Sequence, residues 1–155
     1  MSTPDRNELQ ESLVPEIRRF IAGTILFNQK VADRFGLHLT DMQCLNILDL
    51  LGPATPGTLS EWTGLSTGGV TVMLDRMEKA GFIRREPNPA DRRSILIEIN
   101  ARKLKKVGPV YAEINAQLDA YLAQMSRADL KCVVDFFSGL NGMRTGAKVN
   151  SSAKG

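Results

Sequence analysis

The feature that most constrains the fold is a change in apolar spacing near Gly81. Before it, two short segments, residues 55–64 and 66–80, have helical spacing and are joined by a tight glycine-containing turn. After it, residues 82–86 and 94–99 alternate between apolar and polar side chains, as β-strands do. Two short helices joined in this way predict a helix-turn-helix, and a hairpin directly after it predicts a wing.

The loop between the two predicted strands is longer than a tight hairpin needs. Pro87 and Pro89 stiffen it, and it ends in Asp91, Arg92 and Arg93. A stiff loop of this length projects from its hairpin, so these charges are placed to meet a partner. The alternative interpretation of Asp91 and Arg93 is a loop salt bridge, which is worth little.

Heptad-like seams flank this region, and their members step by four and three residues. We expect Pro15 to start or bend the first helix and Gly36 to end it. The seams hold more apolar surface than one small subunit covers, which predicts an obligate two-fold dimer. The seam residues are Leu13, Ile17, Phe20, Thr24, Phe27 and Val31, and then Val107, Tyr111, Ile114, Leu118, Tyr121 and Met125.

The predicted fold is therefore mainly α with a small β-hairpin. A single domain spans residues 1–155, with a winged helix-turn-helix at 40–100 and dimerisation helices at 12–36 and 101–141. Residues 144–155 are rich in Gly, Ser, Lys and Asn and are expected to be disordered. Capping signals refine the boundaries: Thr40 with Gln43 as a capping box, Thr55, Ser66, Asn100 and Ser126.

The second helix of the predicted pair has two distinct faces. Taking about 100° per residue, its apolar side chains point one way and small side chains point the other, with Thr71, Gly69 and Arg76 on the flanks. Small residues let a helix backbone approach a major groove, an Arg reaches guanine or phosphate, and Val72 suits a thymine methyl. The alternative is a packing helix with one stray exposed valine. We expect Asp75 and Lys79 to form a surface ion pair rather than to contact DNA.

Overall charge does not identify a partner, but its placement does. The chain of 155 residues has a net charge of +3, and all cations of residues 53–100 lie between Arg76 and Arg93. Its hydrophobic fraction of 43% is that of an ordinary globular protein, and no apolar run reaches membrane-spanning length. The polar start at Met1 lacks the pattern of a signal peptide. We expect a cytoplasmic protein.

Several of these residues together resemble the MarR (multiple antibiotic resistance regulator) family. They are Gly64-Leu65-Ser66, the run from Val70 to Arg85, and Asp91-Arg92-Arg93-Ser94, and the resemblance covers residues 12–141. The sharpest motif is Asp-x-Arg-Ser followed by alternating apolar residues. Where members usually continue with Thr and, three residues later, Gly, this chain has Asn100 and Lys103.

The resemblance implies a homodimer with interlocking terminal helices and two winged domains on one face of double-stranded DNA. It implies that Arg93 reaches the minor groove and that Asp91 orients it. The expected operator is pseudo-palindromic. The residues expected to contact DNA are Ser66, Thr67, Gly68, Gly69, Thr71, Val72, Arg76, Asp91, Arg92 and Arg93.

The remaining candidates concern regulation rather than chemistry. No catalytic motif, cofactor site or metal-ligand spacing is present, so we do not expect an enzyme. His38 and Trp62 are candidates for a pocket that binds a small lipophilic or phenolic effector, with packing roles as the alternative. Cys44 and Cys132 are expected to be structural, with a redox switch as the alternative. The predicted function is a DNA-binding regulator, a repressor released by its effector; the alternatives are a winged-helix protein–protein module and a cysteine-based redox sensor.

Overall fold

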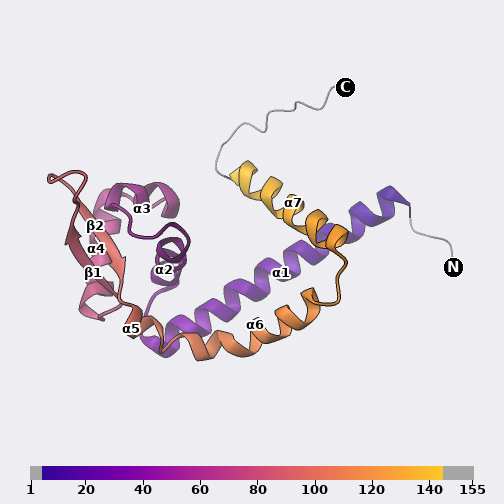
Figure 1. Ribbon diagram of the computed structural model, residues 1–155, viewed down its shortest axis with the longest axis horizontal. Helices are drawn as coiled ribbons and strands as arrows, with labels where there is room; N and C mark the ends of the chain where they lie inside the picture. Colours follow the sequence, from indigo (N-terminus) through magenta and orange to yellow (C-terminus); the bar gives the residue numbers. More distant parts are fainter. Residues whose placement is uncertain (1–4, 145–155) are drawn as a thin grey trace, which may run out of the picture. The chain divides into compact units, whose positions relative to one another are not determined.

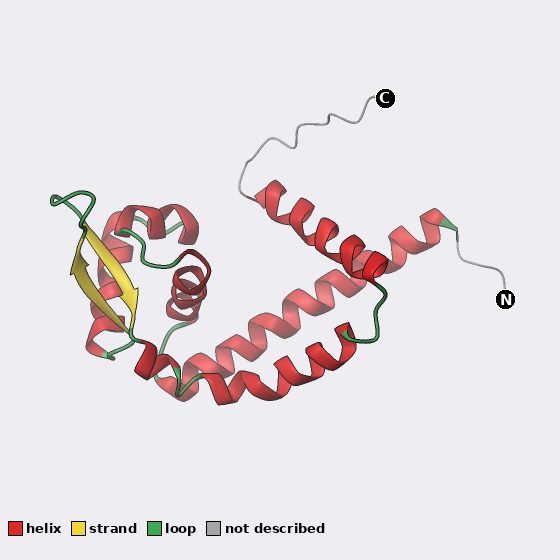
Figure 2. Cartoon of the chain, viewed as in Figure 1, coloured by secondary structure: helices red, strands yellow, loops and turns green. Residues whose placement is uncertain are grey.

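The computed structural model describes residues 5–144, which form helices and one antiparallel hairpin (Figures 1 and 2). The chain divides into two compact units between Val110 and Tyr111. The elements in chain order are α1 (Arg6–Phe35), α2 (Leu39–Leu51), α3 (Pro56–Thr63), α4 (Thr67–Lys79), β1 (Ile83–Pro87), β2 (Ile95–Ile99), α5 (Ala101–Leu104), α6 (Gly108–Leu122) and α7 (Arg127–Arg144). The fold is mainly α with a small β-hairpin, as predicted.

The first helix starts earlier than predicted. Asp5 and Glu8 form a capping box, in which the Asp5 N–H donates to Glu8 Oε2 at 2.8 Å and the Glu8 N–H donates to Asp5 Oδ1 at 2.9 Å. Pro15 lies inside α1 and does not begin it. The expectation that the helix starts near Pro15 is wrong, because the cap is set ten residues upstream and the carbonyl of Glu11, which Pro15 leaves without its helical donor, lies on an exposed stretch open to water. Gly36 ends α1 at φ +65°, as predicted.

The predicted cap of α2 is also wrong. The helix begins at Leu39, so its N-cap is His38, and Thr40 lies exposed within the first turn. Asp41 occupies the third position, and its carboxylate accepts from the His38 N–H at 2.8 Å. A carboxylate there satisfies a free amide and lies at the positive end of the helix.

The core of the first unit lies between α2, α3, α4 and the hairpin. The predicted inner face of α4 is confirmed, with Met73, Leu74 and Met77 at most 1% exposed. Leu59 of α3 and Phe82 before β1 are as deeply buried. The Phe35 ring at the end of α1 meets Phe82 edge to face, with centroids 6.4 Å apart.

The hairpin is joined to the rest of the first unit through the middle of β2. β1 and β2 pair antiparallel from Ile83 with Ile99 to Pro87 with Ile95. Ala54, in the connection from α2 to α3, adds a bridge to Ile97: its N–H donates to the Ile97 carbonyl at 3.2 Å and its own carbonyl accepts at 2.8 Å. The edge of β2 is thereby covered by the α2–α3 connection.

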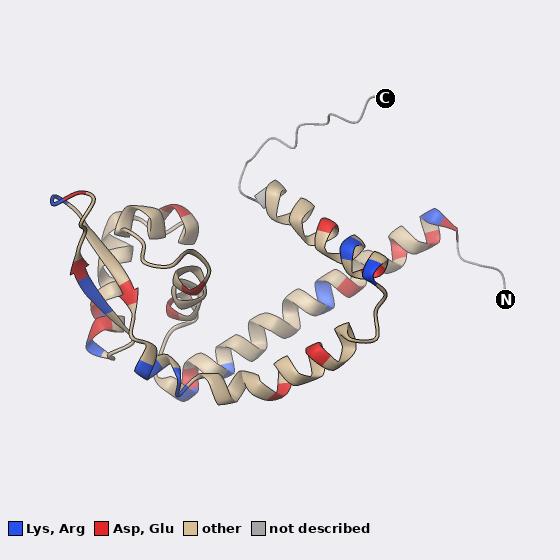
Figure 3. Cartoon of the chain, in the orientation of Figure 1, with Lys and Arg blue, Asp and Glu red and all other residues tan. Residues whose placement is uncertain are grey.

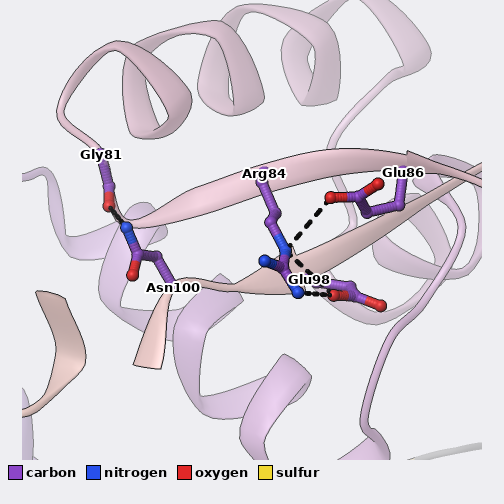
Figure 4. A network of polar contacts seen from close by, with 5 residues as sticks. All are labelled: Gly81, Arg84, Glu86, Glu98 and Asn100. Atoms are coloured by element: carbon purple, nitrogen blue, oxygen red, sulfur yellow. Dashed lines mark hydrogen bonds and ion pairs between the residues drawn. The ribbon is translucent and has the colours of Figure 1, made fainter. Parts of the chain in front are cut away.

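Asn100 connects the hairpin to the helices that follow (Figure 4). Its side-chain amide donates to the Gly81 carbonyl at 2.9 Å, and its Oδ1 accepts from the Arg102 N–H at 3.2 Å, so Asn100 caps α5 as predicted. Lys103, where members of the resembled family usually have Gly, places its Nζ 5.2 Å from the centroid of the Phe82 ring. A cation over an aromatic face is attractive. Asn100 and Lys103 differ from the usual residues of the resembled family, but both make contacts that hold the connection from β2 into α5.

The second unit contains most of α6 and all of the last helix. The helical run is interrupted before Gly108-Pro109, since α5 ends at Leu104 and α6 begins at Gly108. Ser126 caps α7 by accepting from the Asp129 N–H at 3.2 Å, as predicted. The part of the predicted disordered tail that follows residue 144 lies outside the described residues.

Candidate nucleic-acid interface

The exposed side of α4 is small and uncharged over its first two turns. We call Thr67, Gly68, Thr71 and Val72, all exposed, the recognition face. Val72 is 62% exposed, although it is apolar and lies on a helix whose other apolar side chains are buried. The Thr71 hydroxyl donates to the Thr67 carbonyl at 3.0 Å, one turn back along the helix. The face therefore presents methyl groups and open backbone rather than charge.

The start of α4 is built by its cap. Ser66 accepts from the Gly69 N–H at 3.2 Å, and a Cβ added at Gly69 would lie 3.5 Å from the Leu65 Cβ. Gly69 is thus half-buried against the turn. A Cβ at Gly68 would meet no atom within 4 Å. The two glycines differ: Gly68 keeps the approach to the helix open, and Gly69 packs against the turn that starts the helix.

Arg76 does not point away from the protein. Its Nη2 donates to Asp41 Oδ1 at 2.6 Å and its Nε donates to Asp41 Oδ2 at 2.9 Å. Its side chain is 30% exposed, and that of Asp41 is fully buried. The hydrogen bond to Asp41 raises the pKa of Arg76. The placement of Arg76 as an outward cation is corrected: a buried carboxylate on α2 binds both donors of one edge of its guanidinium.

Asp75 and Lys79 do not form the expected surface pair. Asp75 Oδ1 instead accepts from Arg85 Nη2 of β1 at 2.7 Å, and the other terminal nitrogen of Arg85 donates to Glu78. The hydrogen bond to Asp75 is the largest cause that raises the pKa of Arg85, and the interaction with Glu78 raises it further. An arginine that bridges two carboxylates outcompetes a flexible lysine because its planar fork loses less entropy per bond. Arg85 fastens α4 to the hairpin.

The loop between β1 and β2 is held by its own polar side chains. Asn88 Nδ2 donates to Ser94 Oγ at 2.8 Å, and the Ser94 hydroxyl donates to the Asp91 carbonyl at 3.1 Å. Asp91 Oδ1 accepts from the backbone N–H of Arg93 at 3.0 Å. Neither this bond nor any ion pair between described residues joins Asp91 to the Arg93 guanidinium, so the expected side-chain orientation by Asp91 is corrected: Asp91 orders the loop backbone.

Cations at the two ends of the hairpin have different surroundings. Near the base, Arg84 binds Glu98 at 2.7 Å and Glu86 at 3.3 Å (Figure 4). At the tip, Arg92 and Arg93 are exposed, and no ion pair to a described carboxylate holds either of them. Figure 3 shows the positive charge at the loop tip. The tip therefore presents positive charge that is not neutralised within the described chain.

The candidate effector residues lie at the surface of the subunit. His38 is exposed at the N-cap of α2, and Trp62 is 50% exposed. Trp62 does not supply the buried face of α3 in this subunit; Leu59 alone fills that place, at 0% exposure. In the described part of the chain no group of His, Cys, Asp and Glu side chains is arranged to hold a metal ion. None of the described helices combines the length and apolarity of a membrane span.

The two cysteines differ. Cys44 is fully buried, as expected, and this burial together with the negative charge of Asp41 raises the pKa of its thiol to about 12. Cys132 on α7 is exposed in the isolated chain.

Three residues that matter for the site were missed from the sequence. Asp41 carried a detectable signal, because it lies four residues before Leu45 on the apolar stripe of α2, where an unpaired carboxylate would be costly. Arg85 and Asn88 gave no signal in the sequence. The partners of Arg85 depend on how the hairpin packs against α4, and the partner of Asn88 depends on the path of the β1–β2 loop.

Comparison with known proteins agrees with this arrangement. A family model described as the MarR family matches residues 37–95. The uncharacterized HTH-type transcriptional regulator YcgE of Bacillus subtilis is 35% identical over 137 residues, covering 88% of this chain and 89% of that protein. The multiple antibiotic resistance protein MarR of Salmonella typhimurium is 35% identical over 60 residues, which cover 39% of this chain and 42% of that protein.

Solved structures show the same fold. A transcriptional regulator from Thermotoga maritima superposes with a TM-score of 0.62 at 25% identity, covering 86% of this chain and 94% of that one. A MarR family protein from Bacillus stearothermophilus gives a TM-score of 0.63 at 19% identity, covering 91% of this chain and 99% of that one.

Proposed function

Because the chain belongs to the MarR family of DNA-binding transcription regulators, we propose that it binds a pseudo-palindromic operator as a homodimer. The recognition face of α4 enters the major groove in each half-site, and the β1–β2 loop carries Arg93 into the neighbouring minor groove. The remaining proposed contacts come from Ser66 and Gly69 at the start of α4 and from Arg92 in the loop. Asp91 acts by shaping that loop.

The observation that carries this proposal is the pairing of an uncharged helix face with unneutralised cations at the loop tip. A helix fits into a major groove when its outer side chains are small enough for the backbone to approach. The narrow minor groove of A·T-rich DNA concentrates negative potential and attracts arginine. A surface used only for protein packing needs neither feature.

Val72 gives the proposal its most specific element. An exposed valine cannot donate or accept hydrogen bonds, and the one feature of a base edge that it complements is the thymine 5-methyl group. With Thr71 beside it, the recognition face favours half-sites that present thymine in the major groove. Arg76 is removed from the proposed base contacts, because Asp41 holds its guanidinium.

The dimer rests on exposed apolar surface. Large apolar side chains along α1 lie at the surface of the isolated subunit, and exposure of this extent marks an interaction site. We assign dimerisation to residues 12–36 and 101–141 and DNA binding to residues 40–100. The exposed apolar residues of α1 are Leu9, Leu13, Val14, Phe20, Ile21, Ile25 and Leu26.

The regulatory part of the proposal is a repressor that a small lipophilic or phenolic effector releases. His38 and Trp62 are exposed at the surface of the subunit and are the residues we assign to the effector. An effector that favours a different spacing of the two winged domains weakens DNA binding, and DNA weakens effector binding by the same factor.

Selection of bound sequences from random double-stranded DNA tests the proposal. The expected result is a consensus with two-fold symmetry and thymine-containing half-sites about one helical turn apart. Arg93→Ala under the same conditions should enrich the same half-sites with weaker preference for their A·T flanks. No enriched sequence with wild-type protein would overturn the proposal and would favour a winged-helix protein–protein module instead.

A further inference from the structure

The buried carboxylate of Asp41 lies in the first turn of α2 and binds a side chain 35 residues away on α4. It is 0% exposed and accepts three hydrogen bonds: from the His38 N–H at 2.8 Å, from Arg76 Nε at 2.9 Å and from Arg76 Nη2 at 2.6 Å. The positive end of α2 adds a favourable field for the carboxylate. Asp41 therefore joins the N-terminus of one helix to the third turn of another.

Arg76 lies one helical turn after Val72. Because residues four apart share a helix face, a fixed Arg76 side chain restrains rotation of α4 about its axis at the level of Val72. On the other side, Arg85 of β1 binds Asp75 and Glu78. Taking about 100° per residue, the Arg76 and Asp75 tethers lie on opposite sides of Val72.

Stability alone does not account for a pair of this kind. Replacement of a buried ion pair by apolar residues of similar volume is often neutral or stabilising, because desolvation offsets the Coulomb attraction. A bidentate arginine–carboxylate pair does supply direction, since both of its bonds must be aligned together. A binding site needs its groups held to within about 10–20° of the productive geometry.

From this geometry we infer that Asp41 and Arg76 are a positioning pair for operator recognition, which set the rotation of α4 and touch neither base nor phosphate. The inference rests on the proposed function, since it concerns how α4 is presented to the major groove. It assigns sequence discrimination partly to a residue on α2 that is closed to solvent.

The test compares variants of the full chain on operator DNA and on unrelated DNA across a salt series. Asp41→Asn and Arg76→Met should each lower operator affinity by roughly tenfold, the size of a lost base contact. Affinity for unrelated DNA and the salt slope should stay at wild-type values, because no phosphate contact is lost. The double variant should lose no more operator affinity than the single variant that binds less tightly, since both changes break the same interaction.

Two further variants separate positioning from direct contact. Arg76→Lys keeps the charge and loses the bidentate geometry, so it should behave like Arg76→Met. Asp49→Asn, on an exposed residue of the same helix, and Arg102→Met, on an exposed arginine of α5, are the matched controls and should bind like wild type.

Each outcome decides. Wild-type-like binding by Arg76→Lys, with a salt slope reduced by about 1 in Arg76→Met and full affinity in Asp41→Asn, would make Arg76 a phosphate contact and overturn the inference. Wild-type operator affinity in all variants would make the pair merely structural. If thermal melts show that a single variant is unfolded, the double variant replaces it, because it has no uncompensated buried charge. Loss of operator affinity in the double variant with unchanged affinity for unrelated DNA supports the inference, and wild-type operator affinity contradicts it. Absence of sequence selectivity in wild-type protein would overturn the proposed function and this inference together.

Discussion

The carboxylate of Asp91 accepts a hydrogen bond from the backbone N–H of Arg93 at 3.0 Å. Together with the bond from Asn88 Nδ2 to Ser94 Oγ at 2.8 Å, it fixes the path of the loop and leaves the Arg93 side chain exposed. The loop is therefore ordered before it meets a partner, and the arginine at its tip gains position from the backbone rather than from a paired carboxylate.

This arrangement predicts different effects for the two residues. Arg93→Ala should weaken operator binding by about 1–3 kcal/mol, mostly at A·T-rich flanks, with a salt slope reduced by about 1. Asp91→Ala should weaken binding less and leave the salt slope intact, because the cation remains while the loop loosens. Titration of operator DNA at several salt concentrations measures both effects, with Arg102→Ala as a charge-matched control. Full affinity in Arg93→Ala would remove the loop from the interface.

Val72 predicts a dependence on a single methyl group of DNA. Replacing the contacted thymine by deoxyuridine, which lacks only the 5-methyl, should weaken wild-type binding by about 1 kcal/mol, the worth of roughly one buried methylene. Val72→Ala should be insensitive to the same replacement. Equal losses by both proteins would place the contact elsewhere on α4.

The apolar surface of α1 predicts a stable dimer. Light scattering at micromolar concentration should give twice the subunit mass of 17.1 kDa. Phe20→Glu with Leu26→Glu should shift the mass toward that of one subunit, because carboxylates on a buried interface are costly. Leu50→Glu, at a 77% exposed position of α2, is the control. A wild-type monomer at this concentration would contradict the dimer.

Cys44 is expected to be chemically inert in the folded protein. With its pKa raised to about 12 by burial and by the charge of Asp41, roughly one thiol in ten thousand is ionised at pH 8, and only the thiolate reacts. Mass spectrometry after alkylation should show Cys44 unmodified in native protein and modified after denaturation. Rapid native alkylation of Cys44 would support a redox role for this cysteine.

Trp62 offers a direct signal for the effector. It is the single tryptophan of the chain and is half-exposed, so its fluorescence reports occupancy of any site beside it. Small phenolic acids should change that fluorescence and weaken operator binding in parallel, with equal coupling in both directions. Trp62→Phe serves as the blank for the optical signal. Compounds that bind while leaving operator affinity unchanged would argue against effector release.

The sequence predicted the winged helix-turn-helix because local signals agreed with one another there. The apolar stripe of α4, the alternation of β2 and the caps at Ser66 and Asn100 all act over a few residues. The start of α1 was misplaced because Pro15 is a strong local signal, whereas its exposed position, which makes the proline tolerable, is a property of the folded chain.

The site was predicted less completely because charged side chains form ion pairs with residues that are distant in the sequence. Arg76 and Arg85 look alike in the sequence as exposed cations next to a predicted DNA face. Their carboxylate partners, Asp41 for Arg76 and Asp75 with Glu78 for Arg85, are brought to them by the packing of α2 and β1 against α4. No spacing rule along the chain connects residues that lie 35 positions apart.

The recognition face and the anchors of α4 are separate sets of residues. Val70, Met73, Leu74 and Met77 fill the core and Arg76 binds Asp41, whereas Gly68 and Val72 contact little of the protein, and a side chain added at Gly68 would meet open space. Under the proposed function, a mutation at Gly68 or Val72 therefore changes the surface that α4 presents to DNA, with little effect on folding. After duplication of its gene, a chain built this way is free to acquire a new operator by a few exposed substitutions while both copies keep one architecture.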